Sequence, residues 1–282
     1  MLKQIIITAI FASVIFGCKE KQTEMAQQNG YAPVNGINMY YEIHGEGSPL
    51  VLIHGGGSTI QTSFGHILPM LAKNHRVIAV ELQAHGHTGD REAPESFEQD
   101  ADDVAALLGY LKINKADLLG FSNGGSTAMR VAIQHPQLVN KLIVIAGLSK
   151  REGLIKGFFE GMENATINDM PVFLQDAFMK INNDSAKLLN MFNKDKQRML
   201  TFRDWKDEDL ASIKAPSLLI VGDRDVVTTE HTLQMSRLIP NARLLVVPGS
   251  HGDYIGEEAA EVKKTNMPGY VVAIAEDFLN GK

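Results

Sequence analysis

Short apolar runs and segments with helical periodicity alternate over most of the chain. A continuous apolar run is typical of a strand buried on both faces, and apolar residues recurring about every three to four positions are typical of a helix that covers a sheet. The predicted strands span residues 37–43, 50–53, 76–80, 118–119, 141–146, 217–221 and 243–247. The predicted helices span residues 64–73, 100–111, 128–135, 232–239 and 270–279. This alternation predicts an α/β fold with a doubly wound, mostly parallel sheet, in which 37–43 is an antiparallel edge strand.

One segment, from about residue 148 to residue 212, interrupts the alternation. It has no convincing strand pattern, it is rich in Phe and Met, and it contains the only tryptophan, Trp205. A helical insertion after the predicted strand 141–146 would lie over the carboxyl edge of the sheet. We therefore predict a short helical cap whose side chains mostly pack among themselves. Candidates for lining an apolar pocket are Phe158, Met162, Phe178 and Trp205.

The first residues follow a different pattern. Lys3 precedes an apolar stretch over residues 5–17, which is too short for a membrane-spanning helix and has the length of a signal-peptide core. The sequence Ile-Phe-Gly-Cys follows at its end, and Cys18 is the only cysteine in the chain. This stretch resembles the lipobox of bacterial lipoproteins, and the resemblance implies cleavage before Cys18, lipid on its thiol and anchoring to a membrane of the bacterial cell envelope. An ordinary signal peptide or an uncleaved N-terminal anchor is the alternative.

These patterns divide the chain into three parts. We predict a signal peptide over residues 1–17, a flexible polar tether over 18–34, and one folded domain over 35–282 that contains the cap at about 148–212. A single large α/β domain fits a chain of 282 residues better than two equal ones do.

A glycine-flanked serine lies at the centre of the predicted sheet. The apolar run 118–119 leads into Gly120-Phe-Ser-Asn-Gly124, and helical periodicity follows. A strand, a sharp turn and a helix are the context in which Gly-x-Ser-x-Gly exposes a nucleophilic serine, because the glycines let the two elements approach closely. The alternative is a glycine-rich helix cap in which Ser122 only binds a backbone amide. We predict that Ser122 is a nucleophile.

A serine nucleophile needs a base, and nine histidines are available. His251 lies in the loop after the last predicted strand, from which a side chain can reach over the sheet edge. We therefore predict that His251 is the base. The acid that orients it should follow the preceding strand, where both Asp223 and Asp225 lie. Asp253 is a poorer candidate because it is too near His251 along the same loop.

Three motifs in this order resemble those of the α/β-hydrolase family: His54-Gly-Gly-Gly57, the serine turn at 120–124, and Gly222-Asp-Arg-Asp225, with His251 last. The resemblance covers nearly everything from about residue 35 to the end. It implies a triad in the chain order Ser, acid, His. It also implies that the acid is the third residue after the glycine, Asp225, while Asp223 would cap the loop through its own backbone.

Such a triad needs two backbone amides as an oxyanion hole. The first is that of Asn123, which follows the nucleophile, and the second is that of Gly56, with Gly57 as an alternative. Phosphate binding by this glycine loop is a weaker interpretation, because the loop lacks the ending of a P-loop. A metal site at His85 and His87 is also weaker, because the other ligand positions of such motifs hold different residues.

The predicted function is hydrolysis of a carboxylic ester or related acyl bond in a small molecule through an acyl-enzyme, as in carboxylesterases (EC 3.1.1), without a metal or an organic cofactor. A lactonase, a C–C hydrolase or a perhydrolase of the same fold remains open, and so does a non-catalytic surface binding protein. The net charge of −6 and the lack of a Lys/Arg cluster argue against nucleic-acid binding. The sequence does not indicate an oligomeric state.

Overall fold

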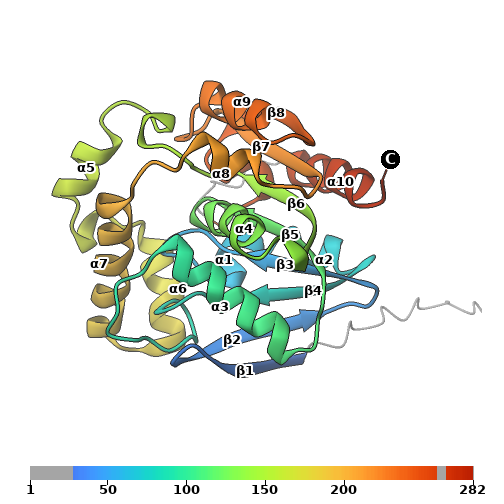
Figure 1. The fold of residues 1–282 in the computed structure, drawn as a ribbon. Helices are drawn as coiled ribbons and strands as arrows, with labels where there is room; N and C mark the ends of the chain where they lie inside the picture. The colour runs from blue at the N-terminus through green and yellow to red at the C-terminus, as the bar shows by residue number, and fades with distance from the viewer. Residues whose placement is uncertain (1–27, 259–264, 282) are drawn as a thin grey trace, which may run out of the picture.

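The computed structural model describes residues 28–258 and 265–281, and its centre is one eight-stranded sheet (Figure 1). The strand order is β1-β2-β4-β3-β5-β6-β7-β8. The strands from β4 to β8 in this order are parallel, and β2 pairs antiparallel with both β1 and β4. The strands are β1 Gln28–Val34, β2 Ile37–His44, β3 Ser48–Ile53, β4 His75–Val80, β5 Ala116–Phe121, β6 Val139–Ile145, β7 Ser217–Arg224 and β8 Ala242–Ser250.

Helices cover both faces of the sheet. In Figure 1, α3 and α4 pack together in front of the sheet, and α10 packs against α2 and lies behind it. This is the doubly wound, mostly parallel α/β fold that the alternating pattern predicts, so the predicted fold class is confirmed. The helices are α1 Ile60–Phe64, α2 Leu68–Leu71, α3 Phe97–Tyr110, α4 Asn123–Gln134, α5 Phe158–Asn164, α6 Val172–Asn182, α7 Ser185–Thr201, α8 Asp207–Ala211, α9 Thr229–Leu238 and α10 Met267–Leu279.

The central strands are buried on both faces, which explains their continuous apolar runs. All six residues of β5 are buried, and so are the last four of β3, the last four of β6 and the first six of β7. Their side chains form the main core with the covering helices. Because the parallel strands share one direction, their carboxyl ends meet at one edge, where the loops that carry Ser122, Asp225 and His251 begin.

The structure corrects the prediction of a tether over residues 18–34. Residues 28–34 form β1, and the whole strand pairs with β2, so β1 and not β2 is the edge strand. Only Ala32 and Val34 turn buried side chains to the core, which leaves a weak hydrophobic pattern. The missed signal is Asn35-Gly36, which joins the two strands with positive φ at both residues, the typical hairpin turn.

The helix predicted over residues 64–73 is also wrong in detail, because the structure has two short helices there, α1 and α2. The first ends at Phe64 with Gly65 as its C-cap, and the second begins at Leu68 with Pro69 in its first turn. Proline lacks the backbone N–H that a continuous helix would need at this position.

The segment between β6 and β7 contains helices α5 to α8. In Figure 1, α5, α6 and α7 lie together at the left of the molecule, beyond the ends of the strands. A small second core holds α6 and α7 together and is formed by Ala84, Met170, Leu174, Phe178, Leu188 and Met191.

Residues 1–27, with the predicted signal peptide and Cys18, lie outside the described residues. No helix in the described part of the chain has the length and hydrophobicity that crossing a bilayer requires.

Candidate active site

Ser122 lies at a strained turn between β5 and α4. Its backbone has φ 55° and ψ −122°, a conformation that a residue with a side chain rarely adopts. The turn is tight because both flanking glycines touch backbone. A Cβ at Gly120 would lie 2.0 Å from the carbonyl oxygen of Gly124, and one at Gly124 would lie 2.1 Å from that of Ile53. The Gly-x-Ser-x-Gly pattern is therefore a steric requirement of the turn.

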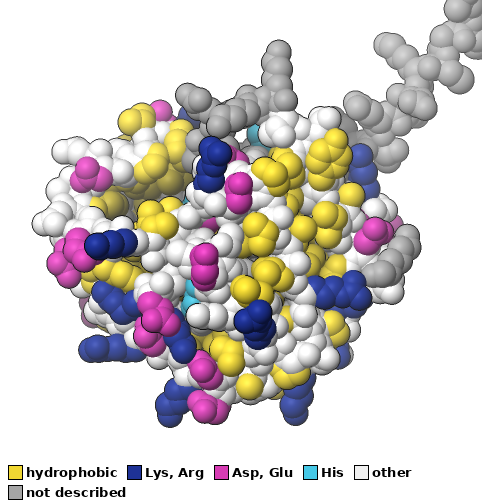
Figure 2. Space-filling view, turned by 90° about the horizontal axis from the view of Figure 1, so that it is seen from above, with side chains coloured by type: hydrophobic (Ala, Val, Ile, Leu, Met, Phe, Trp, Pro, Cys, Tyr) yellow, Lys and Arg dark blue, Asp and Glu magenta, His cyan; other side chains and the backbone are white. Residues whose placement is uncertain are grey.

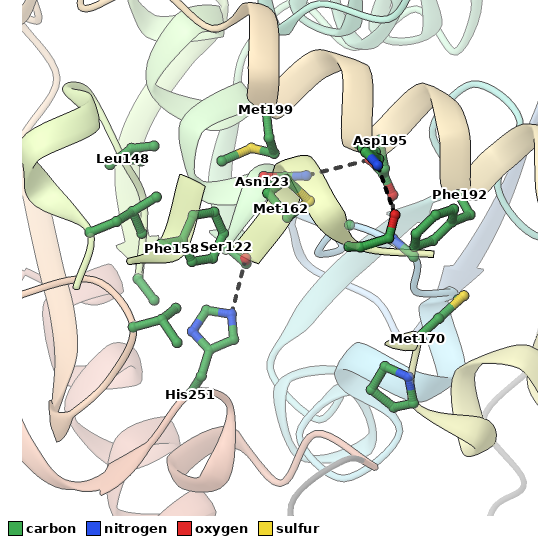
Figure 3. A pocket seen from close by; sticks show the side chains of 18 of the residues that line it. Ser122, Asn123, Leu148, Phe158, Met162, Met170, Phe192, Asp195, Met199 and His251 are labelled. Carbon is green, nitrogen blue, oxygen red and sulfur yellow. Dashed lines mark hydrogen bonds between the residues drawn. The ribbon is translucent and has the colours of Figure 1, made fainter. Parts of the chain in front are cut away.

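The structure brings Ser122, His251 and Asp225 together although they follow three different strands. His251 Nε2 lies 3.1 Å from Ser122 Oγ, the contact drawn in Figure 3. His251 Nδ1 lies 2.7 Å from Asp225 Oδ1. Each contact is within hydrogen-bonding distance, so the geometry can carry a proton from the serine hydroxyl to the imidazole while the carboxylate fixes the ring.

The electrostatics of the pair agree with this geometry. Burial alone would raise the pKa of Asp225, but the hydrogen bond and charge of His251 outweigh burial and lower this pKa overall. Burial alone would lower the pKa of His251, but the hydrogen bond and charge of Asp225, together with the charges of Glu257 and Asp253, outweigh it and raise this pKa. Asp225 therefore stabilises the protonated imidazole, which is the form that a base reaches after it takes a proton.

Tyr254, which the sequence analysis missed, completes the surroundings of Asp225. Its hydroxyl donates to Asp225 Oδ2 at 2.7 Å, and its side chain is fully buried. The backbone amide of Val227 donates to Oδ1 at 3.2 Å. Both carboxylate oxygens thus have fixed partners. The only signal in the sequence is that Tyr254 follows His251 in the same loop.

The two rival aspartates have other partners. Asp223 accepts a hydrogen bond from the backbone amide of Gly249 at 2.8 Å, and Asp253 accepts one from that of Ser250 at 2.9 Å. Asp223 is exposed, whereas Asp225 is buried. Of the two acids at the carboxyl end of β7, Asp223 within the strand and Asp225 directly after it, Asp225 is therefore the one in contact with His251.

Gly56 and Asn123, whose backbone amides are the predicted oxyanion donors, line the same cavity as Ser122 and His251. The Gly56 loop follows β3, and Asn123 is the first residue of α4. Among the described residues neither amide has a hydrogen-bond partner, so both are available to a ligand. The Gly57 amide, in contrast, lies 2.6 Å from Asp195 Oδ2. This occupancy favours Gly56 over Gly57 as the second oxyanion donor.

A cavity of about 350 Å³ opens beside Ser122 and His251, between the sheet edge and the cap. Figure 3 shows Leu148, Phe158 and Met199 around the two residues, with Asp195 and Phe192 further along the cavity. On the surface, hydrophobic side chains line a hollow beside the cap, and acidic and basic side chains are interspersed over the rest of that face (Figure 2). The cavity is mostly apolar, which suits an uncharged organic ligand.

Two of the four predicted lining residues do line the cavity, namely Phe158 and Met162. The other two do not. Phe178 packs in the small core between α6 and α7. Trp205 packs edge-on against Phe97 and Phe202 under the guanidinium of Arg130.

His85 and His87 turn to different partners. His85 Nε2 lies 2.9 Å from Asp195 Oδ2, and His87 Nδ1 lies 2.9 Å from Glu81 Oε2. Within residues 28–258 and 265–281, His, Cys, Asp and Glu side chains form no group that could hold a metal ion.

Comparison with known proteins gives a family match over most of the chain. A model of the alpha/beta hydrolase family matches residues 50–264. The enol-lactonase of Burkholderia xenovorans has the same fold, with a TM-score of 0.67 at 20% identity, and the match covers 87% of this chain and 99% of that one.

Two curated relatives illustrate the range of the family. The dihydrolipoyllysine-residue acetyltransferase component of the acetoin cleaving system from Pseudomonas putida is 31% identical over 81% of this chain, which spans only 65% of that relative's length. The putative carbamate hydrolase RutD of Azorhizobium caulinodans is 27% identical over 78% of this chain and 91% of its own length. On the family match and the shared fold, the chain belongs to the α/β-hydrolase family.

Proposed function

We propose that the protein is a serine hydrolase that cleaves a neutral carboxylic ester, open-chain or lactone, through an acyl-enzyme. The observation that carries this proposal is the pair of hydrogen-bonding contacts that link Ser122 to His251 and His251 to Asp225. Ser122 and His251 line an apolar cavity that can hold the substrate. The names of similar proteins, a lactonase and a carbamate hydrolase, also refer to chemistry at an acyl carbonyl. The reaction class is that of carboxylic-ester hydrolases (EC 3.1.1).

Each residue has a defined task in this reaction. His251 Nε2 takes the proton as Ser122 Oγ attacks the ester carbonyl, and the amides of Gly56 and Asn123 bind the oxygen that becomes negative. His251 then gives the proton to the departing alcohol. Water, deprotonated by the same imidazole, then attacks the acyl carbonyl, and the imidazolium returns that proton to Ser122 Oγ as the acid departs. Asp225 stays ionised and stabilises the imidazolium.

The charges around the cavity favour a neutral substrate. Asp195 and Asp169 both line it, and Lys196 is the only Lys or Arg among its lining residues. The ammonium of Lys196 is already bound by the backbone carbonyl oxygens of Glu163 and Ala165, at 3.0 and 2.7 Å. A carboxylate on the substrate would therefore lose its hydration in a mostly apolar cavity whose one ammonium is already engaged.

The proposal is tested with a panel of p-nitrophenyl esters of increasing acyl length, an uncharged lactone and an ester that carries a carboxylate. We expect turnover of the neutral esters and labelling of Ser122 by a fluorophosphonate probe. We also expect a kcat/KM at least about tenfold lower for the anionic ester, because a cost of about 1.4 kcal/mol for burying its carboxylate in the apolar cavity has that effect. If no ester in the panel is turned over and the probe does not label Ser122, the result favours the alternative, a binding protein on the same scaffold.

We further propose that the mature protein is tethered to a membrane of the bacterial cell envelope through lipid on Cys18. The sequence pattern around Cys18 supports this placement, and the lipid would hold the folded domain at the bilayer surface.

For the Cys18→Ser variant in a bacterial host, we expect loss of acylation and a move from the membrane to the soluble fraction. The activity of a purified domain that begins at Gln28, the first residue of β1, should not depend on Cys18. Mass spectrometry of the membrane-extracted protein is the measurement. An intact Met1 or an unmodified Cys18 in the mature protein contradicts the proposal.

A further inference from the structure

Asp195 connects the cap to the two loops that surround Ser122. It lies in α7, and its carboxylate lines the cavity. Oδ2 accepts the backbone amide of Gly57 at 2.6 Å and lies 2.9 Å from His85 Nε2. Oδ1 accepts Arg198 at 2.6 Å and the side-chain amide of Asn123 at 3.5 Å. One side chain of the cap thus contacts Gly57, the neighbour of one oxyanion donor, and the side chain of Asn123, the other donor.

These contacts act on a run of three glycines, the residue type with the most backbone conformational freedom. Gly55, Gly56 and Gly57 follow one another, and Gly57 has a positive φ of 66°. The free amide of Gly56 can point to a substrate only if this loop keeps one conformation. The space is tight as well, because a Cβ at Gly56 would lie 2.6 Å from Asn123 Nδ2 and 3.2 Å from Asp195 Oδ2.

A carboxylate so near a developing oxyanion needs compensating positive charge. Burial alone would lower the pKa of His85, but the charge and hydrogen bond of Asp195 outweigh it and raise this pKa to about 9. The imidazolium has acceptors at both nitrogens, because Nδ1 lies 2.8 Å from the carbonyl oxygen of Gln83. Arg198 is the second cation at Asp195, and it also binds Glu95 and Asp100. Two cations therefore flank Asp195 and offset its repulsion of the oxyanion.

We propose that Asp195 is a positioning residue of the active site. It fixes the glycine loop to the cap so that the Gly56 amide faces the carbonyl oxygen of the bound ester. This inference rests on the proposed ester hydrolysis. It predicts that the cap contributes to the rate of the chemical step and not only to substrate binding.

The test uses Asp195→Asn, which removes the charge but keeps the volume, and Asp195→Ala, which also removes the acceptors. We expect kcat for a neutral p-nitrophenyl ester to fall roughly 10- to 100-fold in Asp195→Ala and less in Asp195→Asn, with KM within about threefold. The loss of a whole oxyanion donor costs about 10²- to 10³-fold, and a misplaced donor should cost less. Affinity for a boronic acid that forms a tetrahedral adduct with Ser122 should fall with kcat.

Asp184→Ala is the matched control. Asp184 caps the N-terminus of the same helix by accepting the amides of Ala186 and Lys187, so its loss weakens α7 without touching the glycine loop. We expect a lower melting temperature and an unchanged kcat for this variant. All assays are run well below the melting temperature of each variant, so that only folded protein is compared.

Hydrogen exchange of the peptide that contains residues 54–58, measured beside kcat, separates the positioning role of Asp195 from the proposed ester hydrolysis. Faster exchange in the Asp195 variants than in Asp184→Ala, together with the loss of kcat, supports the positioning role. An unchanged kcat, or a loss confined to KM, overturns it while ester hydrolysis stands. An inactive, unlabelled wild-type protein contradicts the hydrolase proposal instead, and unchanged exchange in the Asp195 variants contradicts the loop contact itself.

Discussion

Ser122→Ala is expected to lower the rate of ester hydrolysis by at least about 10⁴-fold and to abolish labelling by a fluorophosphonate probe. The substitution removes the atom that attacks the carbonyl, and the residues that remain supply only binding and oxyanion stabilisation. The fold should persist, because alanine lacks only the hydroxyl, whose contact in the structure is with His251. Steady-state kinetics with the ester panel and mass spectrometry of probe-treated protein are the measurements.

Ser149→Ala is the matched control for this experiment, because Ser149 is another serine in contact with a histidine. Its Oγ lies 3.3 Å from His231 Nε2. No acid orients that imidazole, since Nδ1 of His231 is buried without a partner in the described part of the chain. Burial also lowers the pKa of His231 to about 4, so it is a weak base. Ser149→Ala should therefore keep both turnover and labelling. A Ser122→Ala variant that kept more than about a tenth of wild-type activity would be incompatible with the triad.

Asp225→Asn is expected to reduce kcat by about 10³- to 10⁴-fold, because the amide can no longer fix the imidazole tautomer or stabilise the imidazolium. It should also move the pH dependence of the residual activity. Asp225 raises the pKa of His251, and the base must be neutral to accept a proton. Loss of the carboxylate lowers that pKa, so the acidic limb of the pH–rate profile should shift to lower pH.

Asp223→Asn is the matched comparison two residues away. Asp223 is exposed, and in the described part of the chain its side chain accepts one hydrogen bond, from the backbone amide of Gly249, which asparagine can still accept. We expect kcat within about threefold of the wild type and the same acidic limb. If Asp223→Asn were the more damaging of the two at equal thermal stability, Asp223 and not Asp225 would be the orienting acid.

The motifs that the sequence revealed are those whose chemistry is local. The serine turn needs glycines at fixed positions, and buried parallel strands need continuous apolar runs, so both leave a pattern that is readable without a structure. The choice between Asp223 and Asp225 is different. Their spacing from Gly222 does not decide it, and the family resemblance was required.

The features that were missed depend on contacts between distant parts of the chain. Asp195 contacts Gly57 from a helix more than a hundred residues further along the chain. Nothing in the sequence around Asp195 distinguishes it from a solvent-exposed charged residue. Phe158 and Phe178 both fit helical periodicity, but only the packing of α6 on α7 decides that Phe178 belongs to a small core and not to the cavity. Strand β1 was missed because its register depends on pairing with β2 more than on its own side chains.

The attachment of α7 also bears on how the substrate range of this enzyme could be redesigned. Phe158 and Met162 line the cavity from α5 and not from α7, which carries Asp195, so libraries aimed at new acyl groups can vary them without replacing that residue. A wholesale exchange of the cap for that of another family member would replace Asp195 as well, together with its contact to Gly57. Protein engineers should therefore graft new caps around a retained α7, and selection experiments should recover variation in α5 before variation at Asp195.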